Sequence, residues 1–331
     1  MLLPTLEGFS PDPALESDLA QGLARVEASL DQAVRSEYPF VTTVSRHLVD
    51  AGGKRFRPLL VLLSAQFGDP AAEAVIAAAV AVELTHVATL YHDDVMDEAE
   101  VRRGAETANA RWGNSVAILT GDFLFARSSG ILASLGPDAV RIQAETFERL
   151  CTGQILESVG PADGMDPVKH HLAVLADKTG SLIATSCRYG AMMSGASPDV
   201  TEVLTQFGEL IGVAFQLADD IVDITSDSAQ SGKTPGIDLR EGVPTLATLI
   251  ALGGADPADE RLRELLQRPL PDDAEHAEAL ALLRGHGALD EARAEAGRWA
   301  DEARVVLAPL PAGAPKTALE TLCDYVVTRT G

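Results

Sequence analysis

The sequence is poor in cysteine, in aromatic residues and in basic residues, and each scarcity excludes a class of protein. Its three cysteines, Cys151, Cys187 and Cys323, have no metal-binding spacing and cannot all pair, which favours reduced thiols. Aromatic residues make up 5% of the chain and alanine is abundant, a composition that fits closely packed helices better than sheets. The net charge of −23 argues against nucleic acid or an anionic membrane surface as partners.

Several motifs and segments are also missing. The N-terminus has no basic segment followed by an apolar one, so we expect no signal peptide and a cytoplasmic protein. The most apolar stretch, 76–91, contains Glu83 and His86, which predicts a buried helix and no integral membrane segment. The absence of G-x-x-x-x-G-K-[ST] disfavours a P-loop kinase or ATPase, and neither G-x-S-x-G nor H-E-x-x-H occurs.

Helical periodicity dominates what is present. Residues 1–13 hold three prolines and predict a flexible arm, while 14–331 predict one helical domain. A single amphipathic pattern runs from about 14 to 50, and 228–243 is irregular. No convincing series of alternating strands and no fixed repeat occurs, so the predicted class is all-α. Further helices are predicted over about 58–68, 70–98, 114–135, 137–159, 167–195 and 199–226.

Two aspartate motifs stand at the ends of predicted long helices. The first reads D-D-V-M-D from Asp93 to Asp97, and the second reads D-D-I-V-D from Asp219 to Asp223. Positions i and i+4 share a helix face, so the outer aspartates of each motif point together and repel each other. Both motifs lie inside apolar runs, so ordinary solvated acidic faces explain them poorly. Hard divalent cations such as Mg²⁺ resolve the conflict, usually shared with substrate phosphates.

Basic residues gather at a few places. The run Gly52–Pro58 places three cations at a glycine turn before a helix, and Arg102-Arg103-Gly104 follows the first aspartate motif. Backbone N–H groups and guanidinium groups suit a diphosphate, although each cluster alone is a weak signal. Only five lysines occur among the 26 basic residues, and three of them are Lys54, Lys178 and Lys233. Two carboxylate clusters with dispersed cations together indicate metal-bridged handling of diphosphates.

In combination these motifs resemble the trans-isoprenyl diphosphate synthase (polyprenyl synthetase) family over roughly 40–330. The resemblance implies an isoprenoid synthase fold, a single-domain bundle of many helices around a central cavity, usually assembled as a homodimer. It also implies condensation of isopentenyl diphosphate with an allylic diphosphate, with Mg²⁺ as cofactor and three ions once substrate is bound. The motifs, in chain order, are G-G-K-R-F-R-P, H-D-D-V-M-D-E with R-R-G, K-T-G, F-Q-L-A-D-D-I-V-D, G-K, and D-L-R-E-G with P-T-L.

The resemblance also implies roles for individual residues. Asp93, Asp97 and Asp219 look like Mg²⁺ ligands that hold the allylic diphosphate. The remaining roles fall into three sets: Asp94, Asp220 and Asp223 support the metal ligands; Arg102, Lys178 and Lys233 contact the allylic diphosphate; Lys54, Arg57, His86 and Arg103 form the isopentenyl diphosphate pocket. Thr179 and Gln216 look like dipoles that face the developing allylic cation. Taken alone, His86 is better explained as a core histidine.

One departure and three alternatives accompany this interpretation. Many relatives have lysine after Glu241-Gly242, where this chain has Val243, so one contact to the allylic diphosphate is in doubt. A shorter-chain synthase, making geranylgeranyl or farnesyl diphosphate, is the main alternative. A terpene cyclase would not need the basic run at Gly52–Pro58, and a catalytically inactive regulatory subunit would typically have lost the aspartate motifs.

Product length depends on the residues that precede the first aspartate motif. In the family, a bulky aromatic four or five residues before the first aspartate stops elongation early, whereas this chain has Thr89 and Ala88 there. The same helix face continues with small residues, although small residues also simply permit close helix packing. We therefore expect a long product of roughly seven to ten isoprene units, as used for quinone side chains. The exact length and the preferred allylic primer are left open.

Overall fold

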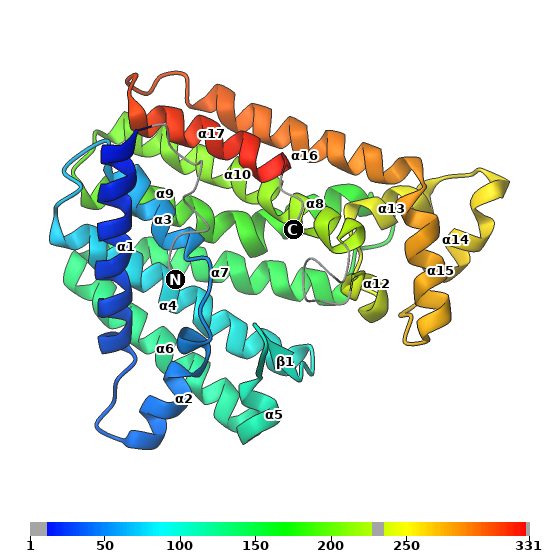
Figure 1. Cartoon of the computed structure of the whole chain (residues 1–331), viewed down its shortest axis with the longest axis horizontal. Helices are drawn as coiled ribbons and strands as arrows, with labels where there is room; N and C mark the ends of the chain where they lie inside the picture. The colour runs from blue at the N-terminus through cyan, green and yellow to red at the C-terminus, as the bar shows by residue number, and fades with distance from the viewer. Residues whose placement is uncertain (1–11, 227–234, 329–331) are drawn as a thin grey trace. The chain divides into compact units, whose positions relative to one another are not determined.

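The computed structural model describes residues 12–226 and 235–328, and the chain is helical over most of this part (Figure 1). The only strands in these ranges are β1 (Val101–Arg102) and β2 (Ala105–Glu106), which pair antiparallel. The all-α class is therefore confirmed. The longer helices are α1 (Pro13–Ala33), α2 (Pro39–Asp50), α3 (Phe56–Ala65), α4 (Glu73–Met96), α6 (Asn114–Leu135), α7 (Pro137–Val159), α8 (Pro167–Leu175), α9 (Ser181–Met193), α10 (Pro198–Thr225), α13 (Leu246–Gly253), α15 (Asp273–Arg284), α16 (Gly287–Val306) and α17 (Ala314–Thr328). The shorter ones are α5 (Ala108–Trp112), α12 (Ile237–Glu241), α14 (Glu260–Leu265) and a 3₁₀ turn at Pro257–Asp259.

Local sequence signals explain where several helices begin. Asp12 caps α1, where its carboxylate accepts from the backbone N–H groups of Ala14 and Leu15, and Pro13 occupies the first helical position. Asp166 caps α8 in the same way, again with a proline as the first helical residue. An aspartate followed by proline satisfies donors at the helix start that have no partner within the helix.

The prediction of one continuous helical pattern over 14–50 was wrong. Two helices cover it, because the chain leaves the helical conformation after α1 and re-enters it at Pro39, with Tyr38 extended as the capping residue. Pro39 lacks the N–H that a helix interior requires but suits a first position. The predicted arm at 1–13 lies almost wholly outside the described residues, and the single domain over 14–331 stays a prediction.

The chain divides into two compact units, each built from separate segments. Unit 1 contains the described parts of Met1–Glu148, Leu182–Gly208 and Pro309–Leu319. Unit 2 contains the described parts of Arg149–Ser181, Glu209–Ala308 and Glu320–Gly331. Four helices, α7, α9, α10 and α17, contribute residues to both units. The two units are described separately.

The centre of unit 1 is α4, which packs lengthwise against α6 and is flanked by α1 and α3 (Figure 1). A glycine permits the close approach of α4 and α6. A Cβ at Gly121 of α6 would lie 2.3 Å from Nε2 of His92 and 3.0 Å from the carbonyl oxygen of Ala88, both on α4. The helix that ends in the first aspartate motif is thereby fixed along most of its length.

Two helices of unit 1, α4 and α6, are long and apolar enough to cross a membrane by length and composition alone. In α4, 72% of the most apolar window is buried, as the sequence predicted for the stretch 76–91, so α4 is a core helix. In α6 the share is 33%, which leaves much of an apolar helix uncovered in the single chain. Core helices of globular proteins often meet such a criterion, so it carries little weight for a membrane span.

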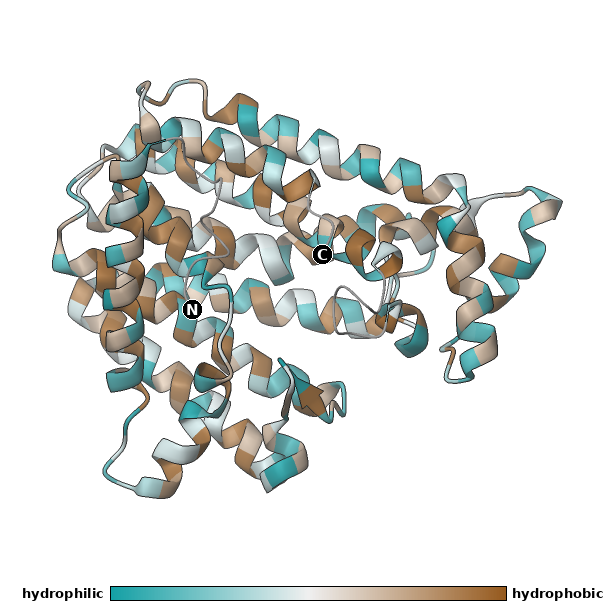
Figure 2. Ribbon diagram, viewed as in Figure 1, coloured by the Kyte–Doolittle hydropathy of each residue, from teal (hydrophilic) through white to brown (hydrophobic). Residues whose placement is uncertain are grey.

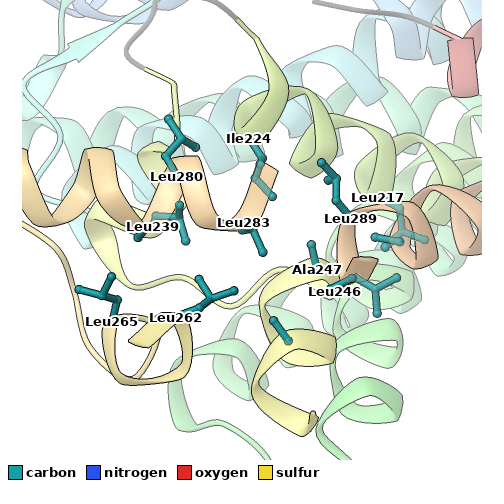
Figure 3. Packing of buried hydrophobic residues seen from close by; sticks show 14 of the residues in the cluster. Leu217, Ile224, Leu239, Leu246, Ala247, Leu262, Leu265, Leu280, Leu283 and Leu289 are labelled. Carbon is teal, nitrogen blue, oxygen red and sulfur yellow. The ribbon is translucent and has the colours of Figure 1, made fainter. Parts of the chain in front are cut away.

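Unit 2 is organised by a leucine-rich cluster at the C-terminal end of α10. Figure 3 shows Leu217 and Ile224 of α10 among leucines from α12, α13, α15 and α16. The neighbouring α16 buries alanines spaced mainly by four residues, and Figure 2 shows hydrophilic and hydrophobic residues interspersed along it. The cluster fixes the end of α10, which carries the second aspartate motif. Its other labelled members are Leu239, Leu246, Ala247, Leu262, Leu265, Leu280, Leu283 and Leu289.

Candidate active site

The first aspartate motif forms the last turn of α4 in unit 1. Asp93 is half-buried and Asp97, the residue that ends the helix, is exposed. Asp94 between them is completely buried, and Nε of Arg102 donates to its Oδ1. Its Oδ2 has no hydrogen-bond partner within 12–226 and 235–328. Negative side chains at a helix C-terminus add to the negative end of the helix dipole, so this turn favours a bound cation.

The arginine turn after this motif is tied to the glycine loop before α3. Arg103 has a left-handed backbone (φ 53°), and its Nη1 donates to the carbonyl oxygens of Leu48, at 3.1 Å, and of Gly52. A Cβ at Gly53 would lie 3.0 Å from this guanidinium. A glycine at position 53 therefore lets the two segments meet, and Arg103 holds them together.

The three cations of the glycine loop have different roles. Lys54 is exposed and Arg57 is half-buried, whereas Arg55 is buried and has a left-handed backbone (φ 49°). Arg55 forms ion pairs with Glu27, at 2.5 Å, and Glu83, at 3.0 Å. Its charge is matched by two carboxylates, so Arg55 fixes the loop, and the sequence did not reveal these partners.

His86 lies two turns before the first aspartate motif, and it is surrounded by positive charge. Burial lowers its pKa well below the ordinary value, and the charges of Arg57, Arg103, Arg102 and Arg55 lower it further. The imidazole is therefore neutral. His86 is half-buried by its surface exposure, and four guanidinium groups acting on its imidazole describe a region of unit 1 that favours an anion.

The second aspartate motif forms the last two turns of α10 in unit 2. The carboxylate of Asp223 accepts from the backbone N–H groups of Ile237 and Asp238, each at 3.3 Å. Its carbonyl oxygen accepts from the N–H of Gly236 at 2.9 Å. Asp223 therefore connects the end of α10 to the start of α12, in addition to its place in the motif.

A chain of hydrogen bonds leads from the K-T-G motif to the second aspartate motif. Oγ1 of Thr179 donates to Oε1 of Gln216 at 3.1 Å, and Nε2 of Gln216 donates to Oδ1 of Asp220 at 2.9 Å. Nε2 of the buried His171 lies 3.9 Å from Oδ2 of Asp220. Burial lowers the pKa of His171 to about 4, so this imidazole is neutral. The two predicted dipoles, Thr179 and Gln216, are in direct contact.

Lys178 is held by a carboxylate. Its Nζ donates to Oε2 of Glu157 on α7 at 2.5 Å. The lysine lies in a π-helical turn, Ala176–Gly180, which interrupts the predicted helix over 167–195. Turns of this kind occur frequently at functional sites. The sequence predicted the lysine but neither the turn nor its glutamate.

Acidic groups in unit 2 are crowded enough to resist ionisation. Burial raises the pKa of Asp220 well above its ordinary value, and the charge of Asp238 raises it further. Burial raises the pKa of Asp238 to about 7, and Asp223 and Glu241 add to the effect. These carboxyl groups need positive charge nearby before all of them can ionise together.

The donors present fit a divalent metal ion shared with a substrate. In the described ranges no three His, Cys, Asp or Glu side chains form a metal-binding group. Mg²⁺ is usually held by one or two carboxylates, with waters and phosphate oxygens completing its coordination. Asp93 with Asp97, and Asp219 beside the crowded carboxyls, provide such incomplete oxygen sets. The unpaired Oδ2 of Asp94 adds a further acceptor next to the first set.

Sequence comparison places this arrangement among known proteins. Residues 38–283 match the family model for polyprenyl synthetase. The chain is also 49% identical over 321 residues to nonaprenyl diphosphate synthase of Mycobacterium tuberculosis, covering 97% of this chain and 96% of that protein. The chain belongs to the polyprenyl synthetase family. The family predicted from the motifs is confirmed.

Solved structures of other members agree with this polyprenyl synthetase assignment. Geranylgeranyl pyrophosphate synthase of Corynebacterium glutamicum, complexed with calcium and isoprenyl diphosphate, matches with a TM-score of 0.87 and 46% identity. The match covers 97% of this chain and 99% of that one. Decaprenyl diphosphate synthase of Rhodobacter capsulatus matches with a TM-score of 0.85 and 34% identity, over 96% and 99% of the two chains. The isoprenoid synthase fold is thereby established.

The structure groups the predicted site residues of this polyprenyl synthetase by unit. Lys233 lies outside the described residues, and the individual roles stay predictions. Unit 1 contains Lys54, Arg57, His86, Ala88, Thr89, Asp93, Asp94, Asp97, Arg102 and Arg103, and unit 2 contains Lys178, Thr179, Gln216, Asp219, Asp220 and Asp223. Sequence reasoning missed Glu27, Glu83, Glu157 and Asp238; only Asp238 left a signal, because it opens the D-L-R-E-G motif.

The raised pKa of Asp238 predicts how stability depends on pH. Its carboxyl binds a proton more tightly when folded, with a pKa of about 7 against an ordinary value of 3.8, so stability falls as pH rises between these values. Asp238→Asn should raise the thermal midpoint at pH 8, without metal or diphosphate, by about 2 °C or more. The gain should be smaller at pH 5. Differential scanning calorimetry measures both, with the exposed Asp163→Asn as control; an equal gain at both pH values would contradict the shift.

Proposed function

We propose that this chain is a prenyltransferase that condenses isopentenyl diphosphate with an allylic diphosphate to make a long all-trans polyprenyl diphosphate. The observation that carries the proposal is that two helices of this polyprenyl synthetase, α4 and α10, each end in an aspartate motif with basic residues nearby. Its 49% identity to a nonaprenyl diphosphate synthase supports a long product. The 46% identity to a geranylgeranyl pyrophosphate synthase keeps a shorter product as the second candidate.

The metal proposed for this site is Mg²⁺. The calcium bound with isoprenyl diphosphate in the Corynebacterium glutamicum synthase supports a divalent cation here as well. Asp93, Asp97 and Asp219 would hold the metal, with Asp94, Asp220 and Asp223 in support, and three ions are proposed once substrate is bound. When bound, the metal neutralises charge on the departing diphosphate. The chain's own groups then have to bind the two diphosphates and orient them.

Two of the proposed binding groups are held by carboxylates. Arg102 pairs with Asp94 and Lys178 pairs with Glu157, so both cations have a defined position for contact with the allylic diphosphate. For the isopentenyl diphosphate, the proposed contacts are Lys54, Arg57, Arg103 and the neutral His86. A neutral imidazole can donate one hydrogen bond to a phosphate oxygen without carrying charge. Fixed donors aimed at an anion stabilise developing charge without reorganising.

No side chain is required to remove the final proton. The allylic C–O bond breaks, the double bond of isopentenyl diphosphate attacks the allylic carbon, and the resulting cation loses a proton to the released diphosphate. Thr179 and Gln216 face this chemistry as dipoles in the proposal. Their mutual hydrogen bond at 3.1 Å, together with the bond from Gln216 to Asp220, fixes the orientation of the Gln216 amide. Oriented dipoles of this kind stabilise a nearby positive charge.

We also propose that the chain acts as a homodimer through α6. Leu119 is 66% exposed and Ile118 is 42% exposed on a helix whose most apolar window is only 33% buried. Exposed Asp122 and Arg127 on the same helix would be costly in lipid but acceptable in a protein interface. A second copy of this surface is therefore the proposed occupant. The three free cysteines support a reducing compartment, which we take to be the cytoplasm.

The proposed activity is tested by incubating the protein with labelled isopentenyl diphosphate, an allylic primer and Mg²⁺, and then sizing the product. Asp93→Ala and Asp219→Ala should each lower kcat by about 10²–10³-fold, because each loses a strong transition-state contact. Asp301→Ala, an exposed residue of α16, is the matched control and should retain activity. Near-normal turnover in both motif variants at saturating Mg²⁺ would rule out the proposed site.

Product length is tested at the two small residues near the first aspartate motif. Ala88→Phe and Thr89→Phe should shorten the product to roughly three or four isoprene units and leave the first condensation largely intact. Ala88 is fully buried, and overpacking costs about 1–3 kcal/mol, whereas Thr89 is half-buried and provides a milder test. A wild-type product that stops at four units, or folded variants with unchanged products, would contradict the proposal.

The dimer is tested by light scattering. The wild-type protein should have twice the 34.8 kDa mass of one chain, and Leu119→Glu should reduce it to a single chain, because a charge is buried without a partner in the interface. Val305→Glu, at an equally exposed position on α16, should remain a dimer. A wild-type monomer, or a Leu119→Glu dimer, would show that α6 has another role.

A further inference from the structure

We propose that Arg149 is a positioning residue, which sets the π-helical turn Ala176–Gly180 and through it the orientation of Lys178 and Thr179. The inference rests on the proposed function, because it assumes that these two residues act on the allylic substrate. All the groups involved belong to unit 2. Arg149 does not itself touch either substrate in this proposal.

The turn needs contacts from outside because it departs from regular helix. A π turn has wider hydrogen-bonded rings than an α-helix and is rare and short for that reason. The five residues of this turn separate α8 from α9, so one extra residue is accommodated there. If the turn relaxed to α-helix, the side chains that precede it would rotate by roughly 100° about the helix axis relative to those that follow it. Lys178 and Thr179 would then point elsewhere.

The guanidinium of Arg149 forms hydrogen bonds with two residues of the turn and also with α10. Its Nε donates to Oδ1 of Asp177 at 2.8 Å, and its Nη2 donates to the carbonyl oxygen of Ala176 at 3.2 Å. The same Nη2 donates to Oε2 of Glu209 at 3.1 Å, and Nη1 donates to Oε1 of Glu209. The planar guanidinium can reach a side chain, a carbonyl and a second carboxylate together, which an ammonium cannot.

One face of α7 is shaped to the turn at three successive positions, spaced by four residues. Arg149 forms hydrogen bonds with the turn. Gly153 allows the turn to pack closely against α7, since a Cβ there would lie 2.8 Å from the backbone nitrogen of Lys178. Glu157 then holds the ammonium of Lys178 at 2.5 Å. Residues i, i+4 and i+8 lie on one helix face, so the three contacts form a single continuous surface.

The π-helical turn also fixes the position of Thr179. The backbone of Gly180 lies against Glu209, since a Cβ on this glycine would be 3.3 Å from the carbonyl oxygen and Oε2 of that residue. Thr179 is buried and donates to Gln216, another α10 residue. Arg149 and Thr179 therefore both fix the turn to α10, one at each side of Lys178.

The kinetic test compares Arg149→Met with Arg149→Lys. Arg149→Met should lower kcat/KM for the allylic diphosphate by about 10- to 100-fold, through a higher KM or a lower kcat. Arg149→Lys should recover only part of this loss. KM for isopentenyl diphosphate should change by less than about twofold, because its proposed contacts lie in unit 1. Arg261→Met, which breaks a comparable double ion pair to Glu264 and Glu278, should leave both values unchanged. An equal rise in KM for both substrates, or a kcat/KM for the allylic diphosphate that stays unchanged, would overturn the proposal.

A double-mutant cycle separates positioning from general stabilisation. In a Lys178→Ala background, Arg149→Met should cost far less than in the wild-type protein, because the group that it orients is gone. Fully additive losses would mean that Arg149 acts independently of Lys178. The Lys178→Ala single variant tests the assumed role of the lysine separately.

Hydrogen exchange provides a test that needs no activity. Arg149→Met and Gly153→Ala should each raise amide exchange in 176–180 by about tenfold or more, while exchange in α16 stays unchanged. Gly153→Ala keeps every charge, so it also addresses the case in which Arg149→Met folds poorly. Unchanged exchange in the turn for folded variants would overturn the proposal, whatever the reaction proves to be.

Discussion

The constraint on which the rest of this structure depends is negative charge at the C-terminal ends of two helices. Asp93 and Asp97 end α4, and Asp219 and Asp223 lie in the last two turns of α10, in a chain of net charge −23. The helix dipole is unfavourable to carboxylates at these ends, and burial makes the charges of Asp94 and Asp220 within the motifs costlier still. The protein lowers part of the cost internally, as when Asp223 accepts two backbone N–H groups, and the remaining cost favours bound cations.

Local pairing of charge follows from this constraint. In so acidic a protein, a cation that is proposed to bind a diphosphate must not be surrounded by several carboxylates, because they would neutralise its charge. Within the part of the chain that the structure describes, Lys178 pairs with Glu157 and Arg102 pairs with Asp94. Arg55 is matched by two carboxylates and is therefore a structural residue of its loop. An acidic protein can bind anionic substrates in this way, since what matters is the arrangement of charges within one turn of the site.

Sequence patterns predicted the elements that depend on local signals. The bounds of α7 were predicted at both ends, because Pro137 begins the helix and Gly160 follows its last residue. Both aspartate motifs were found from their spacing. The division of 14–50 at Pro39 was missed because the apolar periodicity continues across it. The π turn and the partners Glu83, Glu157 and Arg149 were missed because they depend on contacts across 21 to 60 positions of sequence, which no local pattern records.

The central claim, that the two helix ends are built to be completed by metal and diphosphate together, has a direct thermodynamic test. The thermal midpoint of the wild-type protein is measured with Mg²⁺ alone, with inorganic diphosphate alone, and with both. Because each ligand supplies the charge that the other needs, the account predicts a stabilisation by the pair that clearly exceeds the sum of the separate effects. The excess should disappear in a variant with Asp93→Asn and Asp219→Asn. Additive shifts, or an excess that survives in this variant, would contradict the account.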